Sequence, residues 1–170
     1  MKLLAIDAAT EACSVAVCDG DVIHGQFEVC PQQHSQRLLP MVQQVLAEAE
    51  LQLSDLELLA FGRGPGSFTG VRIATGMIQG LALGTELPVA GVSTMAAMAQ
   101  QAYAQQGAEY IAVAIDARMQ EVYFAQYQIE NGLAKLIGEE AVLPPAQAAE
   151  LLGDNPVSYT HLTLPTTSRV

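Results

Sequence analysis

The start of the chain alternates between apolar segments and turn residues. Residues 2–7 form an apolar run that ends in a carboxylate, which is typical of a central strand buried on both faces. In residues 12–18 the side chains alternate along the strand, and Asp19 and Gly20 follow, a pair that favours a two-residue hairpin turn. Residues 22–29 form the returning strand. The chain is therefore predicted to open with three antiparallel strands.

The apolar period then changes. Over residues 34–51 apolar side chains recur at spacings of three and four, which predicts an amphipathic helix. Pro40 is expected in the first turn of the ordered helix, which should then start near residues 35–39, because proline disrupts a helix interior. The pattern further predicts strands at 56–61 and 88–92 and helices at 70–83 and 93–106.

A sequence repeat indicates the fold class. The tetrapeptide Ala-Ile-Asp-Ala at 5–8 recurs at 114–117, each time at the end of an apolar strand, and both copies continue into an alternating strand and a tight turn, at 131–132 in the second copy. Chance similarity of short hairpins is the alternative, but the shared strand ending favours duplication. We predict a duplicated α/β fold with a first lobe at 1–109 and an incomplete second lobe at 110–156.

The end of the chain differs from the rest. The second copy reaches three strands and the start of a helix at 144–152, without later strand-helix units. Residues 157–162 can be encoded by a nucleotide sequence that resembles the end of a transposon adapter used in sequencing libraries. We expect the natural protein to continue past Pro156 and residues 157–170 to be a foreign tail without function.

Charge and composition exclude several functional classes. Seven Lys and Arg residues against eighteen Asp and Glu residues give a net charge of -11, and 51% of the residues are hydrophobic. This excludes a disordered acidic tail and disfavours binding of nucleic acid or anionic lipid by charge alone. The most apolar run, 71–92, is interrupted by Arg72, Gln79 and Glu86, so no membrane span is predicted. The N-terminus lacks the apolar region of a signal peptide, so a cytoplasmic location is expected.

Candidate chemistry is sparse. Cys13 and Cys18 project to opposite faces of one strand and cannot share a metal ion, so they are expected to be small buried side chains. Asp7 ends its strand where open sheets place ligand-binding groups, but the glycines of a phosphate-binding loop do not follow it. The loop at 62–70 has four glycines without the Lys-Ser/Thr pair of a P-loop, which favours a rigid connector. No catalytic residue, metal or cofactor is predicted.

The helix after this loop, which Ser67 or Thr69 can cap, carries glycine at every fourth position: Gly76, Gly80 and Gly84. Each glycine inside a helix costs up to about 1 kcal/mol relative to alanine. Three in register indicate that another backbone packs very close. Either a neighbouring helix of the same lobe or a helix of a partner chain fits this pattern.

Five segments together resemble the TsaB (YeaZ) family. They are MKLLAID at 1–7, HSQRLLP at 34–40, GRGPGSFTGVR at 62–72, GVST at 91–94 and AIDAR at 114–118. The resemblance implies the actin-like, Hsp70-like and sugar-kinase-like (ASKHA) fold, a duplicated α/β architecture, with a complete first lobe and a truncated second lobe. Ala8 stands where the family commonly has threonine, which speaks against a phosphate role there.

The resemblance also implies a function without catalysis. Members of this family are dimerisation partners of TsaD, which transfers the threonylcarbamoyl group to adenosine in tRNA, and the ATPase TsaE joins the assembly. The protein is therefore expected to be a non-catalytic scaffold subunit, homodimeric in the absence of TsaD, that meets tRNA only through its partners. The alternative is a small ATPase or phosphotransferase of the same fold.

Two helices define an expected partner surface. Those at about 35–51 and 70–84 follow successive elements of the first lobe, so they are expected side by side on one sheet face, with apolar surface to spare. Homodimer and heterodimer would compete for this surface. The expected interface residues are Leu38, Leu39, Met41, Val42, Val45 and Leu46 on the first helix and Ile73, Gly76, Met77, Gly80, Leu81 and Gly84 on the second.

Overall fold

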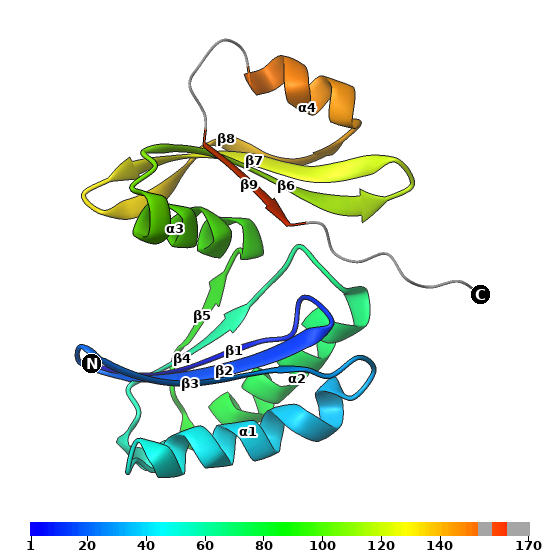
Figure 1. Cartoon of the computed structure of the whole chain (residues 1–170). Helices are drawn as coiled ribbons and strands as arrows, with labels where there is room; N and C mark the ends of the chain where they lie inside the picture. Colours follow the sequence, from blue (N-terminus) through cyan, green and yellow to red (C-terminus); the bar gives the residue numbers. More distant parts are fainter. Residues whose placement is uncertain (153–157, 163–170) are drawn as a thin grey trace. The chain divides into compact units, whose positions relative to one another are not determined.

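A computed structural model of the chain describes residues 1–152 and 158–162 (Figure 1). The chain divides into two compact units, Met1–Ser93 and Thr94–Val170. The division falls before helix α3 (Thr94–Gln106), not after it at residue 109 as the sequence suggested. The reason is packing, because the buried side of α3, with Met95 and Met98, belongs to the apolar core of the second unit.

The first unit contains a five-stranded sheet in the order β3-β2-β1-β4-β5. Its strands are β1 (Lys2–Asp7), β2 (Ala12–Asp19), β3 (Val22–Val29), β4 (Leu58–Gly62) and β5 (Val89–Val92). The first three strands pair antiparallel, as predicted, and β4 and β5 continue the sheet parallel to β1. The first hairpin turns at Gly20 and Asp21, one residue later than predicted, because Asp19 still pairs with Val22.

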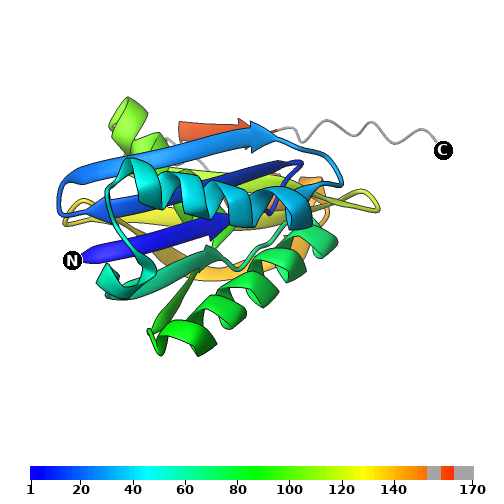
Figure 2. The ribbon, with the colours of Figure 1, turned by 90° about the horizontal axis from the view of Figure 1, so that it is seen from below.

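Helices α1 (His34–Glu48) and α2 (Phe68–Thr85) lie side by side on one face of this sheet (Figures 1 and 2). A short 3-10 turn at Leu53–Asp55 precedes β4. The alternation of β2 is as predicted, since Cys13, Val15 and Val17 are buried in the core whereas Cys18 is half-buried on the other face. The core therefore lies between the sheet and the two helices.

Helix α1 starts earlier than the proline rule suggested. It begins at His34, so Pro40 lies inside the helix and not in its first turn. Proline there removes one backbone hydrogen bond, but Pro40 is on the exposed side, where water replaces the lost donor. On the opposite side Leu38 and Val45 are completely buried, and that burial outweighs the local cost.

The second unit contains a four-stranded sheet in the order β8-β7-β6-β9. Its strands are β6 (Tyr110–Arg118), β7 (Glu121–Glu130), β8 (Leu133–Leu143) and β9 (Ser158–Leu162). Alternate residues of β6 face opposite sides: Ile111 and Val113 pack with α3, and Ala112 belongs to the cluster that includes Ala148 of helix α4 (Pro145–Leu152). Figure 1 shows these two helices on opposite faces of the sheet.

The two sheets confirm the predicted duplication. In each unit three consecutive antiparallel strands form one side of the sheet, and a later strand pairs parallel to the first of them, β4 in one unit and β9 in the other. Strand β9 falls within 157–170, and the prediction that this segment is a foreign tail stays a prediction; residues 157 and 163–170 lie outside the described residues. Over the described ranges, no helix combines the length and the apolar character needed to cross a bilayer.

Candidate interaction surface

The two aspartates of the repeated tetrapeptide accept similar local hydrogen bonds, but only Asp7 ends its strand, since β6 continues past Asp116 to Arg118. Asp7 Oδ1 accepts a hydrogen bond from the backbone N–H of Ala9 at 2.9 Å, and Asp116 Oδ1 accepts one from Arg118 at 2.7 Å. Such side-chain caps of the following backbone are an ordinary way to turn a chain. Both carboxylates therefore have a structural role, Asp7 at the end of β1 and Asp116 at the irregular pairing near the end of β6.

Asp7 differs from Asp116 in its surroundings. A Cβ atom placed on Gly62 would lie 1.6 Å from Asp7 Oδ2, so the carboxylate packs directly on the bare backbone of β4. This burial raises the pKa of Asp7 above its usual value, and the hydrogen bond from Ala9 opposes the shift. Asp116, in contrast, is exposed.

The change Asp7→Asn is expected to raise Tm at pH 7. The amide oxygen can keep the Ala9 hydrogen bond, and the desolvated charge is removed. An acid with a raised folded-state pKa weakens the fold at pH values above that pKa, so the gain should shrink as the pH falls through it towards the unfolded-state value. Thermal melts between pH 4 and 7 measure this. Asp116→Asn is the matched control, with little gain expected; a loss of stability in Asp7→Asn at every pH would show that the fold requires the charge.

The glycine-rich loop at 62–70 packs against the turn that follows Asp7. The backbone N–H of Ser67 donates to the carbonyl of Ala9 at 2.6 Å. A Cβ atom on Gly66 would lie 2.4 Å from that same oxygen, and one on Gly70 would lie 1.9 Å from the carbonyl oxygen of Ala8. Glycine is needed at these positions because the loop backbone lies against the backbone of Ala8 and Ala9. This internal packing supports the prediction of a rigid connector. Ser67 also caps α2, as expected, accepting from the N–H of Gly70 at 3.3 Å.

The structure corrects most of the partner surface expected on α1. Five of the six interface residues expected on α1 lie in the core between this helix and the sheet. The apolar side of α1 is just wide enough to cover the sheet, so almost no apolar surface is left for a partner. The five residues are Leu38, Met41, Val42, Val45 and Leu46. Leu39 alone among the six is exposed, at 45% of its surface. The five buried residues are therefore unavailable to a partner in this fold.

The expected residues of α2 divide into two groups. Ile73, Met77 and Leu81 are partly buried and pack against the core of the first unit. Gly76, Gly80 and Gly84 are exposed. A Cβ atom placed on any of these three glycines would meet no atom within 4 Å, so packing against α1 does not explain them.

Large side chains accompany these glycines on the exposed side of α2. Phe68 has 71% of its surface exposed and Leu83 has 85%. The guanidinium carbon of Arg72 lies 3.6 Å from the centre of the Phe68 ring, a cation–π contact that holds both side chains at the start of the helix. We call this surface the glycine face; it comprises Phe68, Arg72, Gly76, Gly80, Leu83 and Gly84.

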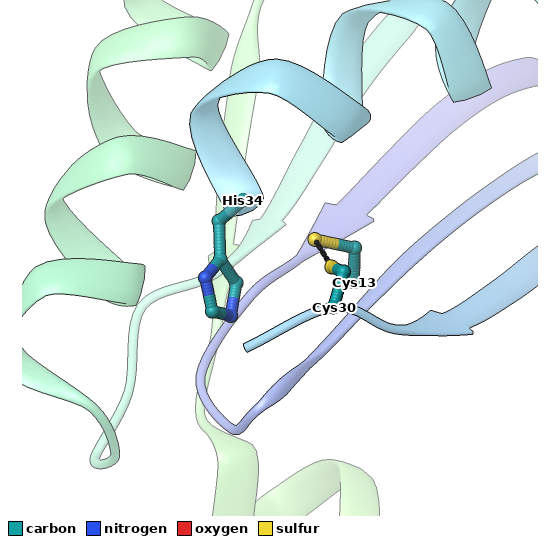
Figure 3. Close-up of side chains that lie close together, drawn as sticks. All are labelled: Cys13, Cys30 and His34. Atoms are coloured by element: carbon teal, nitrogen blue, oxygen red, sulfur yellow. Dashed lines mark hydrogen bonds between the residues drawn. The ribbon is translucent and has the colours of Figure 1, made fainter. Parts of the chain in front are cut away.

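A further group of side chains was missed by the sequence analysis. Cys13, Cys30 and His34 are all buried, and their possible ligand atoms lie within 4.8 Å of one another (Figure 3). Cys30 is seventeen positions from Cys13 and lies outside the strand that contains Cys13 and Cys18, so local spacing does not connect it with Cys13. The register of the first hairpin is the signal that could have paired them, since it sets residue 30 beside the strand that contains Cys13.

The fold places the chain in the actin-like, Hsp70-like and sugar-kinase-like class. Its structure matches the ROK hexokinase from Thermus thermophilus with a TM-score of 0.50 at 20% identity, over 82% of this chain and 49% of the hexokinase, a likeness of fold alone. Residues 26–164 match the family model "TsaD: tRNA N6-adenosine threonylcarbamoyltransferase".

Similarity to individual proteins is more specific. The chain is 56% identical to the Escherichia coli tRNA threonylcarbamoyladenosine biosynthesis protein TsaB over 85% of this chain and 63% of that protein. It is 44% identical to the Haemophilus influenzae protein of the same name, over 91% of this chain and 70% of that protein. The solved structure of YeaZ from Pseudomonas aeruginosa matches with a TM-score of 0.82 and 56% identity, over 85% of this chain and 68% of that one. The chain belongs to the TsaB (YeaZ) family, and it spans less than two thirds of the length of the Escherichia coli relative.

Proposed function

We propose that this protein acts in the synthesis of threonylcarbamoyladenosine in tRNA as a non-catalytic dimerisation subunit that binds TsaD. The names of its relatives support the pathway. The observation that carries the role is the row of three exposed glycines on α2, which no atom of the described chain covers. A binding surface explains why the helix retains them.

The energetic argument is direct. Gly76 and Gly80 lie in the interior of α2 and together cost up to about 2 kcal/mol relative to alanine, and Gly84 lies in the last turn of the helix. No packing contact within the first unit offsets this loss of helix stability, because the space beside each glycine is open. A helix from a partner can use that space to approach at the close end of the usual range of about 8–10 Å between helix axes.

The glycine face also has the anchors that a partner helix needs. Phe68 and Leu83 offer exposed apolar surface, and fully desolvated apolar side chains contribute strongly to interfaces. Leu39 on the neighbouring helix α1 is also exposed. A second copy of the chain and TsaD would bind the same face, so homodimer and heterodimer compete. TsaE joins the assembly in this proposal, and the complex acts in the cytoplasm.

Mixing the protein with TsaD tests the association. Sedimentation velocity should show a self-associated species alone and a heavier species of mixed composition when TsaD is added. The self-associated species should disappear as TsaD is titrated in, because both use one face. Independent sedimentation of the two proteins at micromolar concentration would refute the proposed role.

Absence of nucleotide chemistry is the second part of the proposal. The glycine loop packs onto the backbone of Ala8 and Ala9, and Asp7 turns back on its own chain. Isothermal titration with ATP and Mg²⁺ is therefore expected to show no tight binding. Tight binding with turnover that is lost in Asp7→Asn would favour the alternative, a small ATPase or phosphotransferase of the same fold.

Contact with tRNA is proposed to occur through the partners. A net charge of -11 repels the phosphate backbone, and few cations are present to release counterions. In a filter-binding assay at moderate salt the isolated chain should not retain tRNA, whereas TsaD with the chain should. Sub-micromolar affinity of the isolated chain for tRNA would contradict this prediction.

A further inference from the structure

Two buried thiols meet at the end of the first hairpin. Cys13 lies on β2 opposite Glu28, and Cys30 directly follows β3, where its backbone N–H donates to the carbonyl of Glu11 at 3.0 Å. The two sulfur atoms share a hydrogen bond at 2.8 Å (Figure 3). Both cysteines are free and both are buried in the core.

We propose that Cys13 and Cys30 are a modification site that forms a reversible disulfide on reaction with hydrogen peroxide. The inference is independent of the proposed role in tRNA modification. It rests on the position of the two residues on adjacent antiparallel backbone segments, which the hydrogen bond from Cys30 to Glu11 holds together. Their side chains already touch, so the bond can form without rearrangement of the sheet.

The chemistry balances with one peroxide molecule. The sulfur of Cys30 attacks one peroxide oxygen, the O–O bond breaks, and the departing hydroxide takes the thiol proton to leave as water. Cys30 is then a sulfenic acid. The sulfur of Cys13 attacks the sulfenic sulfur, the S–O bond breaks, and a second hydroxide leaves with the Cys13 proton as water. Two electrons pass from the two sulfurs to the peroxide.

The two thiols can exchange roles in these steps, and the balance is the same whichever sulfur attacks first. Burial, with the neighbouring Cys30, raises the pKa of Cys13 to about 12, so Cys13 holds its proton at neutral pH and oxidation of the pair is expected to be slow. Because both thiols are buried, a small oxidant should reach them before a bulky one does.

A shared metal ion fits the same cluster less well. Two thiolates on one tetrahedral zinc ion stand about 3.8 Å apart, given Zn–S bonds of about 2.3 Å, whereas these sulfurs are 2.8 Å apart. The third member, His34, donates from Nε2 to the carbonyl oxygen of Thr10 at 2.8 Å, which leaves Nδ1 as its nitrogen for an ion, so it is the sulfur distance that disfavours a metal. The arrangement thus favours a bond between the sulfurs over an ion between them.

Peroxide treatment of a Cys18→Ser variant tests the proposal. Cys18, the third free cysteine, is half-buried on the other face, and serine can keep its hydrogen bond to the carbonyl of Gly20. After oxidation, both remaining thiols should resist alkylation and the intact mass should fall by two hydrogens. Dithiothreitol should reverse both changes. The oxidised protein should also have a higher Tm, because the cross-link restricts the unfolded chain.

Two double variants provide the control. Cys13→Ser/Cys18→Ser and Cys30→Ser/Cys18→Ser each retain one thiol of the pair, so neither should lose two hydrogens or gain Tm on oxidation. Peptide mapping of the oxidised parent chain, which needs no substitution, should recover a cross-linked peptide containing Cys13 and Cys30. The proposal is wrong if both thiols remain alkylatable after peroxide has oxidised Cys18 in the parent chain. Zinc that co-purifies with the chain and blocks oxidation until a chelator removes it would also overturn it and assign the cluster to a metal.

Discussion

Replacing Gly80 with leucine is expected to weaken both self-association and binding to TsaD by roughly 10- to 100-fold. Gly80 lies at the middle of the glycine row, and its Cβ direction opens into free space, so the leucine side chain would project from the surface. In a close helix pair this side chain overpacks the interface, at a cost of about 1–3 kcal/mol. Sedimentation velocity of the variant, alone and with TsaD, measures the loss.

The isolated variant should remain folded, with unchanged circular dichroism, because no atom of the described chain lies within 4 Å of the added position. Ala97→Leu is the matched control: it adds the same bulk at an exposed position of α3, outside the glycine face. We expect this control to associate like the parent chain. If Gly80→Leu still dimerises and still binds TsaD with parental affinity, the glycine face is not the interface.

Replacing Gly70 with alanine is expected to destabilise the first unit by about 2 kcal/mol. The new methyl group would lie 1.9 Å from the carbonyl oxygen of Ala8, which is backbone and cannot turn aside as a side chain can. Overpacking of this kind costs up to about 3 kcal/mol, against a gain of up to about 1 kcal/mol in helix propensity. The Tm of this unit should fall by roughly 8–16 °C in a thermal melt.

Gly76→Ala provides the comparison within the same helix. The added methyl group would enter open space, so only the higher helix propensity of alanine changes stability. The free energy of unfolding should rise by up to about 1 kcal/mol. If Gly70→Ala lowers the free energy of unfolding and Gly76→Ala raises it, Gly70 is required for internal packing and Gly76 is not. Equal gains at both positions would mean that the loop does not press on Ala8 as described.

Local patterns predicted the elements well because they depend on neighbours in the sequence. The apolar period separated the strands of the first hairpin from helix α1, and the two turns with glycine marked matching positions in the two copies. The repeated Ile-Asp strand ending predicted duplication, and Asp7 and Asp116 accept similar local hydrogen bonds in the structure. Pro40 was one exception, since burial of the opposite side of α1 overrides a local rule about proline.

The sequence by itself determined the order of the helices and longer strands as far as α4, the duplicated α/β class and the presence of unusual glycines on α2, but not strand β9, which lies in the segment expected to be a foreign tail. It could not determine which side chains are left over for a partner, because exposure depends on how much surface the sheet and the second helix already cover. The apolar side chains of α1 are buried in the core of the first unit, whereas Gly76, Gly80 and Gly84 of α2 stay exposed. Cys13 was not paired with Cys30, since their contact depends on the register of the first hairpin, whose turn lies one residue later than the sequence predicted. Spacing along the chain fixes periodicity, but only packing in three dimensions decides which residues meet and which stay free to bind.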